Sequence, residues 1–131
     1  MTNKIEFATA IPIAMIAPMK DWILRVVPVA QSMSRTPQRT AGIVSTIADS
    51  AGGYAGFTLF PADASVLTVE YKLNLIAPAA GERLVAEAEV VKPGRTLAIT
   101  RGEVYAEADG KRSLCAIMQQ TLIVLSGKAD D

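Results

Sequence analysis

The sequence contains no histidine and only one cysteine, Cys115. Without histidine, the Ser–His and Cys–His nucleophile pairs and the usual His-containing zinc sites are excluded. A single cysteine cannot form an intrachain disulfide, and without a neighbouring base we expect Cys115 to be a core residue. A hydrolase built from this chain would need a carboxylate as its general base.

The chain also lacks any excess of charge and any long hydrophobic run. Lys+Arg and Asp+Glu both number 13, so the formal net charge is zero. This balance argues against nucleic acid as a partner and favours self-association. The apolar run from Phe7 to Met19 is too short to span a bilayer and is interrupted by Pro12 and Pro18. We therefore expect a cytoplasmic protein with no membrane segment.

The 131 residues, half of them apolar, fit a single domain over 1–131, with its core in residues 41–125. The first 40 residues are ambiguous. A short helix over Pro18–Leu24 competes with a strand over Trp22–Ala30, and residues 31–39 have the composition of a polar loop.

The remaining residues predict one helix and four strands. The helix spans Ala41–Leu59 and ends before Pro61. The first strand alternates, with one face formed by Leu67, Val69, Tyr71, Leu73 and Leu75 and the other by Thr68, Glu70, Lys72 and Asn74. Three more strands cover 83–91, 97–107 and 111–125, with a tight turn at Asp109-Gly110 before the last. A helix followed by four consecutive antiparallel strands predicts an α+β fold.

Asp49 lies near the middle of this apolar helix, among small residues. The positions that share its helical face are Gly42, Ser45, Thr46, Gly52, Gly53 and Gly56. The opposite side, which we expect to fill the core, carries Ile43, Val44, Ile47, Ala51 and Tyr54. One interpretation is packing, in which a strand or helix approaches closely and Asp49 is solvated at the seam. The other is a substrate channel in which Asp49 acts as base or nucleophile. These residues alone favour packing.

Three segments resemble the hotdog-fold thioesterases of the phenylacetic-acid-degradation (PaaI-like) type. They are TAGIVSTIADSAGGYAG (40–56), SVLTVEYKLNLIAPAAGERL (65–84) and VVKPGRTLA (90–98). The resemblance implies a hotdog fold, in which a long curved antiparallel sheet wraps a central helix, and assembly as a homodimer or homotetramer. It also implies hydrolysis of acyl-CoA thioesters without metal or organic cofactor, coenzyme A being part of the substrate.

The resemblance also assigns roles to residues. The catalytic carboxylate of the family falls on Asp49, and the amide that polarises the thioester carbonyl falls on Ala41. Gly42 would keep the start of the helix slim enough for the thioester to approach. Thr68 would orient the attacking water, and Thr40 stands where the family has a histidine.

Three basic residues around the KPGRT turn, Lys92, Arg95 and Arg101, are candidates for the phosphates of coenzyme A, with a solvated turn as the equal alternative. The missing histidine motivates a second function class, a catalytically silent module that binds acyl-CoA or another ligand. Dehydration of a hydroxyacyl thioester is a weaker third alternative, because the histidine usual for that chemistry is absent.

Overall fold

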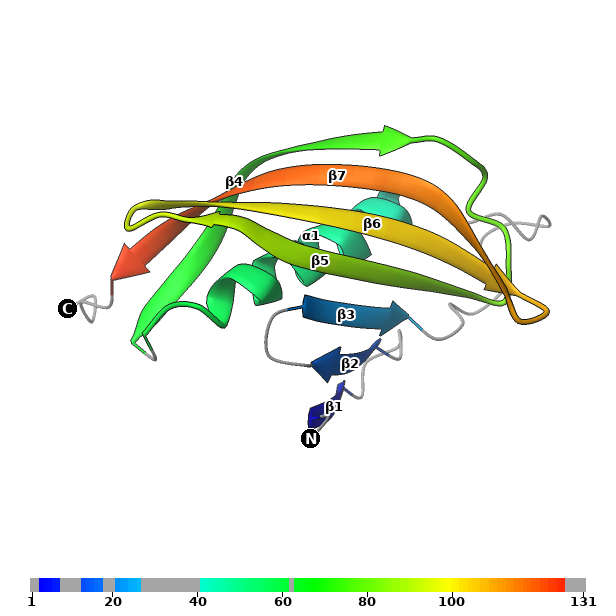
Figure 1. Cartoon of the computed structure of the whole chain (residues 1–131), viewed down its shortest axis with the longest axis horizontal. Coiled ribbons are helices and arrows are strands. Elements are labelled where there is room, and N and C mark those ends of the chain that lie inside the picture. The colour runs from blue at the N-terminus through cyan, green and yellow to red at the C-terminus, as the bar shows by residue number, and fades with distance from the viewer. Residues whose placement is uncertain (1–2, 8–12, 18–20, 27–40, 62, 127–131) are drawn as a thin grey trace.

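The computed structural model describes residues 3–7, 13–17, 21–26, 41–61 and 63–126. These form one helix, α1, and a seven-stranded antiparallel sheet of order β1-β2-β3-β5-β6-β7-β4 (Figure 1). The elements are β1 (Asn3–Phe7), β2 (Ile13–Ala17), β3 (Asp21–Val26), α1 (Ala41–Phe57), β4 (Ala64–Leu75), β5 (Arg83–Pro93), β6 (Leu97–Ala108) and β7 (Lys111–Ser126).

The long strands β4, β5, β6 and β7 curve over α1, which packs against one face of the sheet (Figure 1). The core between them consists mainly of small and branched apolar side chains, including Val44, Ile47, Ala48, Ala51 and Ala55 of the helix and Leu84, Ala86, Val104, Ala116 and Met118 of the sheet. Alanine and glycine on the helix allow the sheet to approach closely. The predicted hotdog architecture, a central helix wrapped by a curved antiparallel sheet, is confirmed.

The order of the strands differs from a simple succession of hairpins. β4 pairs with β7, not with β5, so the segment between β4 and β5 connects opposite sides of the four-stranded core. The hairpins β5–β6 and β6–β7 are formed as predicted. At the second of these, Asp109 and Gly110 have φ angles of 50° and 72°, the positive values that a two-residue hairpin turn requires.

The N-terminal segment adds three strands to the sheet. Residues 21–26 form β3, which pairs with β5, so the predicted helix is wrong over Asp21–Leu24 and the competing strand is correct up to Val26. Because every residue of β3 pairs with β5, the backbone N–H and C=O groups of β3 find hydrogen-bond partners within the sheet. The predicted polar loop at 31–39 lies outside the described residues.

Strand β4 contains a β-bulge at Val69. Thr68 and Glu70 pair with consecutive residues of β7, which leaves Val69 without a place in the ladder. The additional residue reverses the alternation of side chains. Thr68 and Tyr71, three positions apart, therefore both bond to side chains of α1. The alternation predicted for the whole strand, with Thr68 and Tyr71 on opposite faces, is wrong because it assumed no bulge.

Among the described residues, α1 is the one helix, and it is neither long nor apolar enough to cross a membrane.

Candidate active site

Asp49 and Thr68 meet where α1 faces β4. The Thr68 hydroxyl donates a hydrogen bond to Asp49 Oδ1 at 2.7 Å. Both residues are partly buried, so the carboxylate is held by the protein while part of it stays accessible. The sequence predicted both residues as members of the site, and the structure brings them into direct contact.

Two further residues, Gln120 on β7 and Thr100 on β6, extend this contact into a chain of hydrogen bonds. The Gln120 Nε2 amide donates to Asp49 Oδ1 at 2.5 Å and also contacts the Asp49 backbone oxygen at 3.2 Å. The Thr100 hydroxyl donates to Gln120 Oε1 at 2.8 Å. Gln120 and Thr100 are 1% and 0% exposed. They are the two buried polar residues of the described structure.

Sequence reasoning missed both residues, although a signal exists. Gln120 lies between Met118 and Leu122 on a buried face of β7, and Thr100 lies between inward-facing small residues of β6. A polar side chain in such a series must find a hydrogen-bond partner inside the protein. Two polar interruptions on neighbouring strands therefore mark a buried polar network.

The three glycines that follow Asp49, namely Gly52, Gly53 and Gly56, differ in how closely other residues approach them. A Cβ added to Gly52 would lie 2.7 Å from Thr100 Oγ1 and would also clash with Gln120, and one added to Gly56 would clash with Leu122. A Cβ on Gly53 would have no neighbour within 4 Å. Close packing therefore explains Gly52 and Gly56, whereas Gly53 leaves open space next to Asp49.

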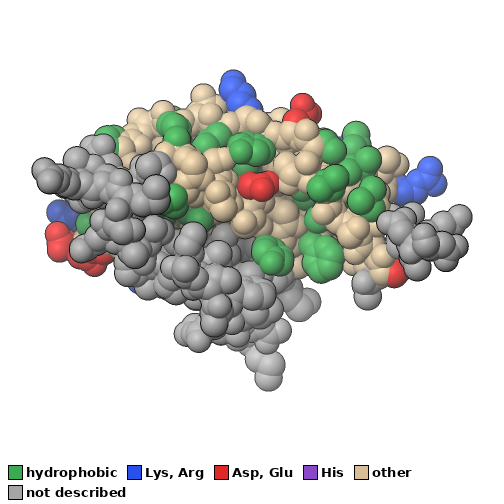
Figure 2. Space-filling view, turned by 180° about the vertical axis from the view of Figure 1, so that it is seen from behind, with side chains coloured by type: hydrophobic (Ala, Val, Ile, Leu, Met, Phe, Trp, Pro, Cys, Tyr) green, Lys and Arg blue, Asp and Glu red, His purple; other side chains and the backbone are tan. Residues whose placement is uncertain are grey.

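That open space is a pocket of about 300 Å³. Its walls come from α1 and β4 and consist of Asp49, Ser50, Gly53, Tyr54, Phe57, Ser65, Val66 and Thr68. Tyr54, which we expected on the core side of the helix, is instead 38% exposed and lines the pocket. Figure 2 shows the side of the molecule opposite to that of Figure 1, where patches of apolar side chains lie on the same face as an acidic side chain. The pocket thus combines a carboxylate with two aromatic rings.

Ala41 lies at a second, separate pocket. This pocket, of about 380 Å³, is lined by Ala41, Val44, Cys115 and the segment 75–79. Ala41 and Asp49 are eight residues apart on α1, which corresponds to about 12 Å along the helix axis. Gly42, next to Ala41, is exposed, and its carbonyl accepts a hydrogen bond from the Thr46 hydroxyl at 2.8 Å. Thr40 lies outside the described residues.

The three basic candidates do not line the pocket of Asp49 within one chain. Lys92 near the end of β5 and Arg95 in the following turn are exposed. Arg101 is exposed next to the buried Thr100, which places it on the outer face of the sheet, where it pairs with Glu89. Binding of coenzyme A phosphates by these residues stays a prediction.

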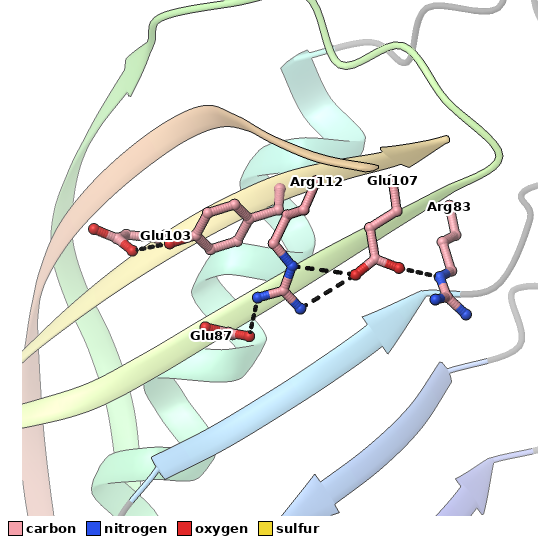
Figure 3. Close-up of polar contacts among 6 residues, drawn as sticks. Arg83, Glu87, Glu103, Glu107 and Arg112 are labelled. Carbon is pink, nitrogen blue, oxygen red and sulfur yellow. Dashed lines mark hydrogen bonds and ion pairs between the residues drawn. The ribbon is translucent and has the colours of Figure 1, made fainter. Parts of the chain in front are cut away.

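A cluster of charged side chains joins β5, β6 and β7 (Figure 3). Glu107 accepts hydrogen bonds from Arg83 and, at 3.2 Å, from Arg112, which also donates to Glu87 at 2.7 Å. Burial alone would raise the pKa of Glu107, but the hydrogen bonds from the two arginines outweigh it, and the pKa lies below its usual value. The cluster ties β5, β6 and the start of β7 together.

Tyr105 belongs to the same cluster. Its hydroxyl donates to Glu103, and the Arg112 guanidinium lies 4.7 Å from the centre of its ring. The hydrogen bond to Glu103, helped by burial and by the negative charge of that glutamate, raises the pKa of Tyr105 to about 12. The phenol is therefore a hydrogen-bond donor at neutral pH.

Cys115 is buried, as predicted. It is 1% exposed, its thiol donates to the Val104 carbonyl at 3.2 Å, and burial raises its pKa. These three observations describe an unreactive core thiol. Within the described part of the chain, no group of three or more His, Cys, Asp or Glu residues could hold a metal ion.

Comparison with known proteins identifies the family. The model of the thioesterase superfamily matches residues 41–113, which contain α1, β4, β5 and β6. The chain belongs to this superfamily. A protein of Halobacterium salinarum that carries the name of an esterase is 36% identical over 70 residues, which are 52% of this chain. The match spans only 46% of the length of that relative.

Solved structures agree with this assignment. A thioesterase family protein from Silicibacter pomeroyi is 42% identical, with a TM-score of 0.81 over 90% of this chain and 86% of its own. A phenylacetic acid degradation-related protein from Ralstonia eutropha shares the fold at 20% identity, with a TM-score of 0.72 over 85% and 83% of the two chains. A Bacillus halodurans protein crystallised with CoA shares it at 24% identity, with a TM-score of 0.68 over 79% and 66%. The resemblance to PaaI-like hotdog thioesterases is confirmed.

Proposed function

We propose that the protein hydrolyses acyl-CoA thioesters and that Asp49 is the catalytic carboxylate. The observation that carries this proposal is the Asp49–Thr68 hydrogen bond at the wall of a partly apolar pocket, in a chain of the thioesterase superfamily. The apolar walls suit an acyl group, and the carboxylate supplies the base that a protein without histidine needs. The CoA bound to the structural neighbour from Bacillus halodurans supports this class of substrate.

Two routes are open to a carboxylate at this position. As a general base, Asp49 takes a proton from water, and the resulting hydroxide attacks the thioester carbonyl carbon. As a nucleophile, Asp49 attacks that carbon itself and forms a mixed anhydride, which water then hydrolyses. In both routes the C–S bond breaks, and the thiolate of coenzyme A leaves and takes up a proton. Thr68 would hold Asp49 or the attacking water in line.

We further propose that a second copy of the chain completes the site. The carbonyl oxygen of the substrate needs an N–H donor within about 3 Å. The Ala41 amide of the same chain lies in the other pocket, about 12 Å along α1 from Asp49. The amide of Ala41 in a second copy could instead approach the carbonyl. Strand β4, the last in the sheet order, carries the exposed apolar residues Leu67, Val69 and Leu75, which favour association.

Release of coenzyme A from a panel of short, medium and aromatic acyl-CoAs tests the function. Asp49→Asn is the matched variant, because it keeps the size of the side chain and removes the base. We expect wild type to turn over at least one substrate and Asp49→Asn to lose about 10²–10⁴-fold in kcat. An unchanged rate in Asp49→Asn would rule out this mechanism.

Two further measurements sharpen the result. A single turnover in H₂¹⁸O identifies the nucleophilic route if the label enters the Asp49 carboxylate, because only hydrolysis of a mixed anhydride at the Asp49 carbon places it there. Label in the acid product alone is expected from the general-base route and from hydrolysis of the anhydride at its acyl carbon. Light scattering measures whether the active form is a dimer or tetramer. Binding of an acyl-CoA analogue without turnover of any acyl-CoA would identify the silent binding module instead.

A further inference from the structure

We infer that Gln120 and Thr100 are positioning residues, which hold the carboxylate of Asp49 by Oδ1 so that Oδ2 is the reacting oxygen. This inference rests on the proposed function. It adds two residues, on β7 and β6, to the catalytic candidates from the sequence, which lie on α1 and β4.

The orientation of the Gln120 amide follows from its partners. Its Nε2 group lies 2.5 Å from Asp49 Oδ1, 3.2 Å from the Asp49 backbone oxygen and 3.0 Å from Thr68 Oγ1. A flipped amide would place Oε1 against the first two of these atoms, which can only accept hydrogen bonds. The Thr100 hydroxyl, which donates to Oε1 at 2.8 Å, stabilises the correct orientation from the other side. Thr100 therefore acts on Asp49 through Gln120.

The Thr68 hydroxyl completes the arrangement, since it also donates to Oδ1. Among the described residues, both side-chain donors to the Asp49 carboxylate thus bind the same oxygen. Oδ2 is left as the oxygen available to a water or thioester in the pocket that Asp49 lines.

Burial shows that this network is not a surface feature. Gln120 and Thr100 are almost completely inaccessible, in a region otherwise formed by apolar side chains. An apolar pair of the same size would pack there without needing hydrogen bonds. The adjacent helix position is Gly52, where any side chain would displace these two residues. The absence of a side chain at Gly52 thus leaves the space that Gln120 and Thr100 occupy, and Gln120 donates to the Asp49 carboxylate.

Steady-state kinetics of four variants test the inference on an acyl-CoA that wild type hydrolyses. Gln120→Leu removes the donor at nearly constant volume, Thr100→Val removes only the hydroxyl, and Thr100→Ser restores it. We expect a loss of about 10–100-fold in kcat for Gln120→Leu, with KM within twofold of wild type, since a misplaced catalytic group mainly affects the chemical step. We expect a smaller loss for Thr100→Val and near-normal kcat for Thr100→Ser.

The double variant Thr100→Val/Gln120→Leu separates positioning from packing. If Thr100 acts through Gln120, the double variant loses no more than Gln120→Leu alone. Losses that multiply, a change in KM in place of kcat, or normal kcat in Gln120→Leu would overturn the inference. Thermal unfolding checks each protein, and if Gln120→Leu does not fold, the comparison of Thr100→Val with Thr100→Ser decides.

The proposed function can fail separately from this inference. Its failure appears as an inactive wild type, or as full activity in Asp49→Asn. Failure of the positioning role appears as an active wild type and an inactive Asp49→Asn, with normal kcat in both Gln120→Leu and Thr100→Val.

Discussion

Gln120 donates its side-chain amide to Asp49 Oδ1 at 2.5 Å, although 71 positions separate the two residues in the chain. The contact joins the middle of α1 to the last strand of the sheet. The candidate site is therefore a product of the tertiary fold, because neither residue could hold its position without the packing of α1 against β7.

Gly52 and Gly53 are neighbours in α1, but we predict opposite effects when each becomes alanine. Gly52→Ala should destabilise the protein by about 1–3 kcal/mol, since the new methyl group collides with Gln120 and Thr100. Gly53→Ala should stabilise it by about 0.5–1 kcal/mol, because its Cβ meets no neighbour and alanine favours the helix. Urea denaturation of both variants measures the difference. Equal effects would contradict the close approach of the sheet at Gly52.

Thr68 is predicted to act through its hydroxyl alone. Thr68→Val keeps the shape of the side chain but cannot donate to Asp49, so kcat should fall about tenfold or more. Thr68→Ser keeps the donor and should retain most of the activity. Acyl-CoA hydrolysis by the two variants, compared with their melting temperatures, measures the effect. Equal rates in the two variants would exclude a role for the hydrogen bond.

Glu107 is predicted to stabilise the fold in its charged form. Arg83 and Arg112 lower the pKa of Glu107 in the folded state. The contribution of Glu107 to the free energy of unfolding is therefore complete above the usual pKa of 4.5, and it is lost as the pH falls through the lower pKa of the folded state. Glu107→Gln should therefore cost about 1 kcal/mol at pH 7, and this cost should shrink as the pH falls below 4.5. Urea unfolding at a series of pH values from 7 downwards measures the trend.

Glu89→Gln is the matched control for Glu107. Among the described residues Glu89 forms one ion pair, with Arg101, and its side chain is 47% exposed, compared with 14% for Glu107. Solvent weakens such a pair, so the loss should be smaller at pH 7. A larger loss for Glu89→Gln would contradict the importance of the cluster in Figure 3.

Cys115 should be protected from thiol reagents in the folded protein. Its side chain is buried, and burial raises its pKa, so both access and thiolate formation are suppressed. At pH 8 we expect reaction with an aromatic disulfide reagent at least about 100-fold slower than in urea-unfolded protein. Because the chain has one cysteine, the signal comes from this residue alone. Rapid labelling under native conditions would contradict its position in the core.

The architecture could be predicted largely because its elements have strong local patterns. The start of α1, the strands β5 and β6 and the Asp109-Gly110 turn all depend on neighbours in the sequence, whereas α1 ends at Phe57, two residues before the predicted end at Leu59. The pairing of β4 with β7 could not be predicted in this way, because it depends on which strand edge is free after the sheet has curved over the helix.

The site was predictable where it coincided with the family pattern and not where it depended on packing. Asp49 and Thr68 were assigned by resemblance, but periodicity alone placed Thr68 opposite Tyr71, because one bulged residue reverses the face. Gln120 could have been noticed as a polar residue in a buried strand. Its contact with Asp49 could not have been predicted, because that contact depends on how α1 packs against β7.

The pairing of β4 with β7 also determines when the site can exist during synthesis. Ala64 pairs with Ser126, and the whole of β5 and β6 is made between them. The ribosome adds Asp49 71 positions before Gln120, so the growing chain holds this aspartate on an apolar segment before its buried partner exists. Closing so distant a pair is a late step, because its contacts must first offset the entropy of the intervening loop. The Asp49 carboxylate would thus gain its fixed orientation only when the last strand has been made.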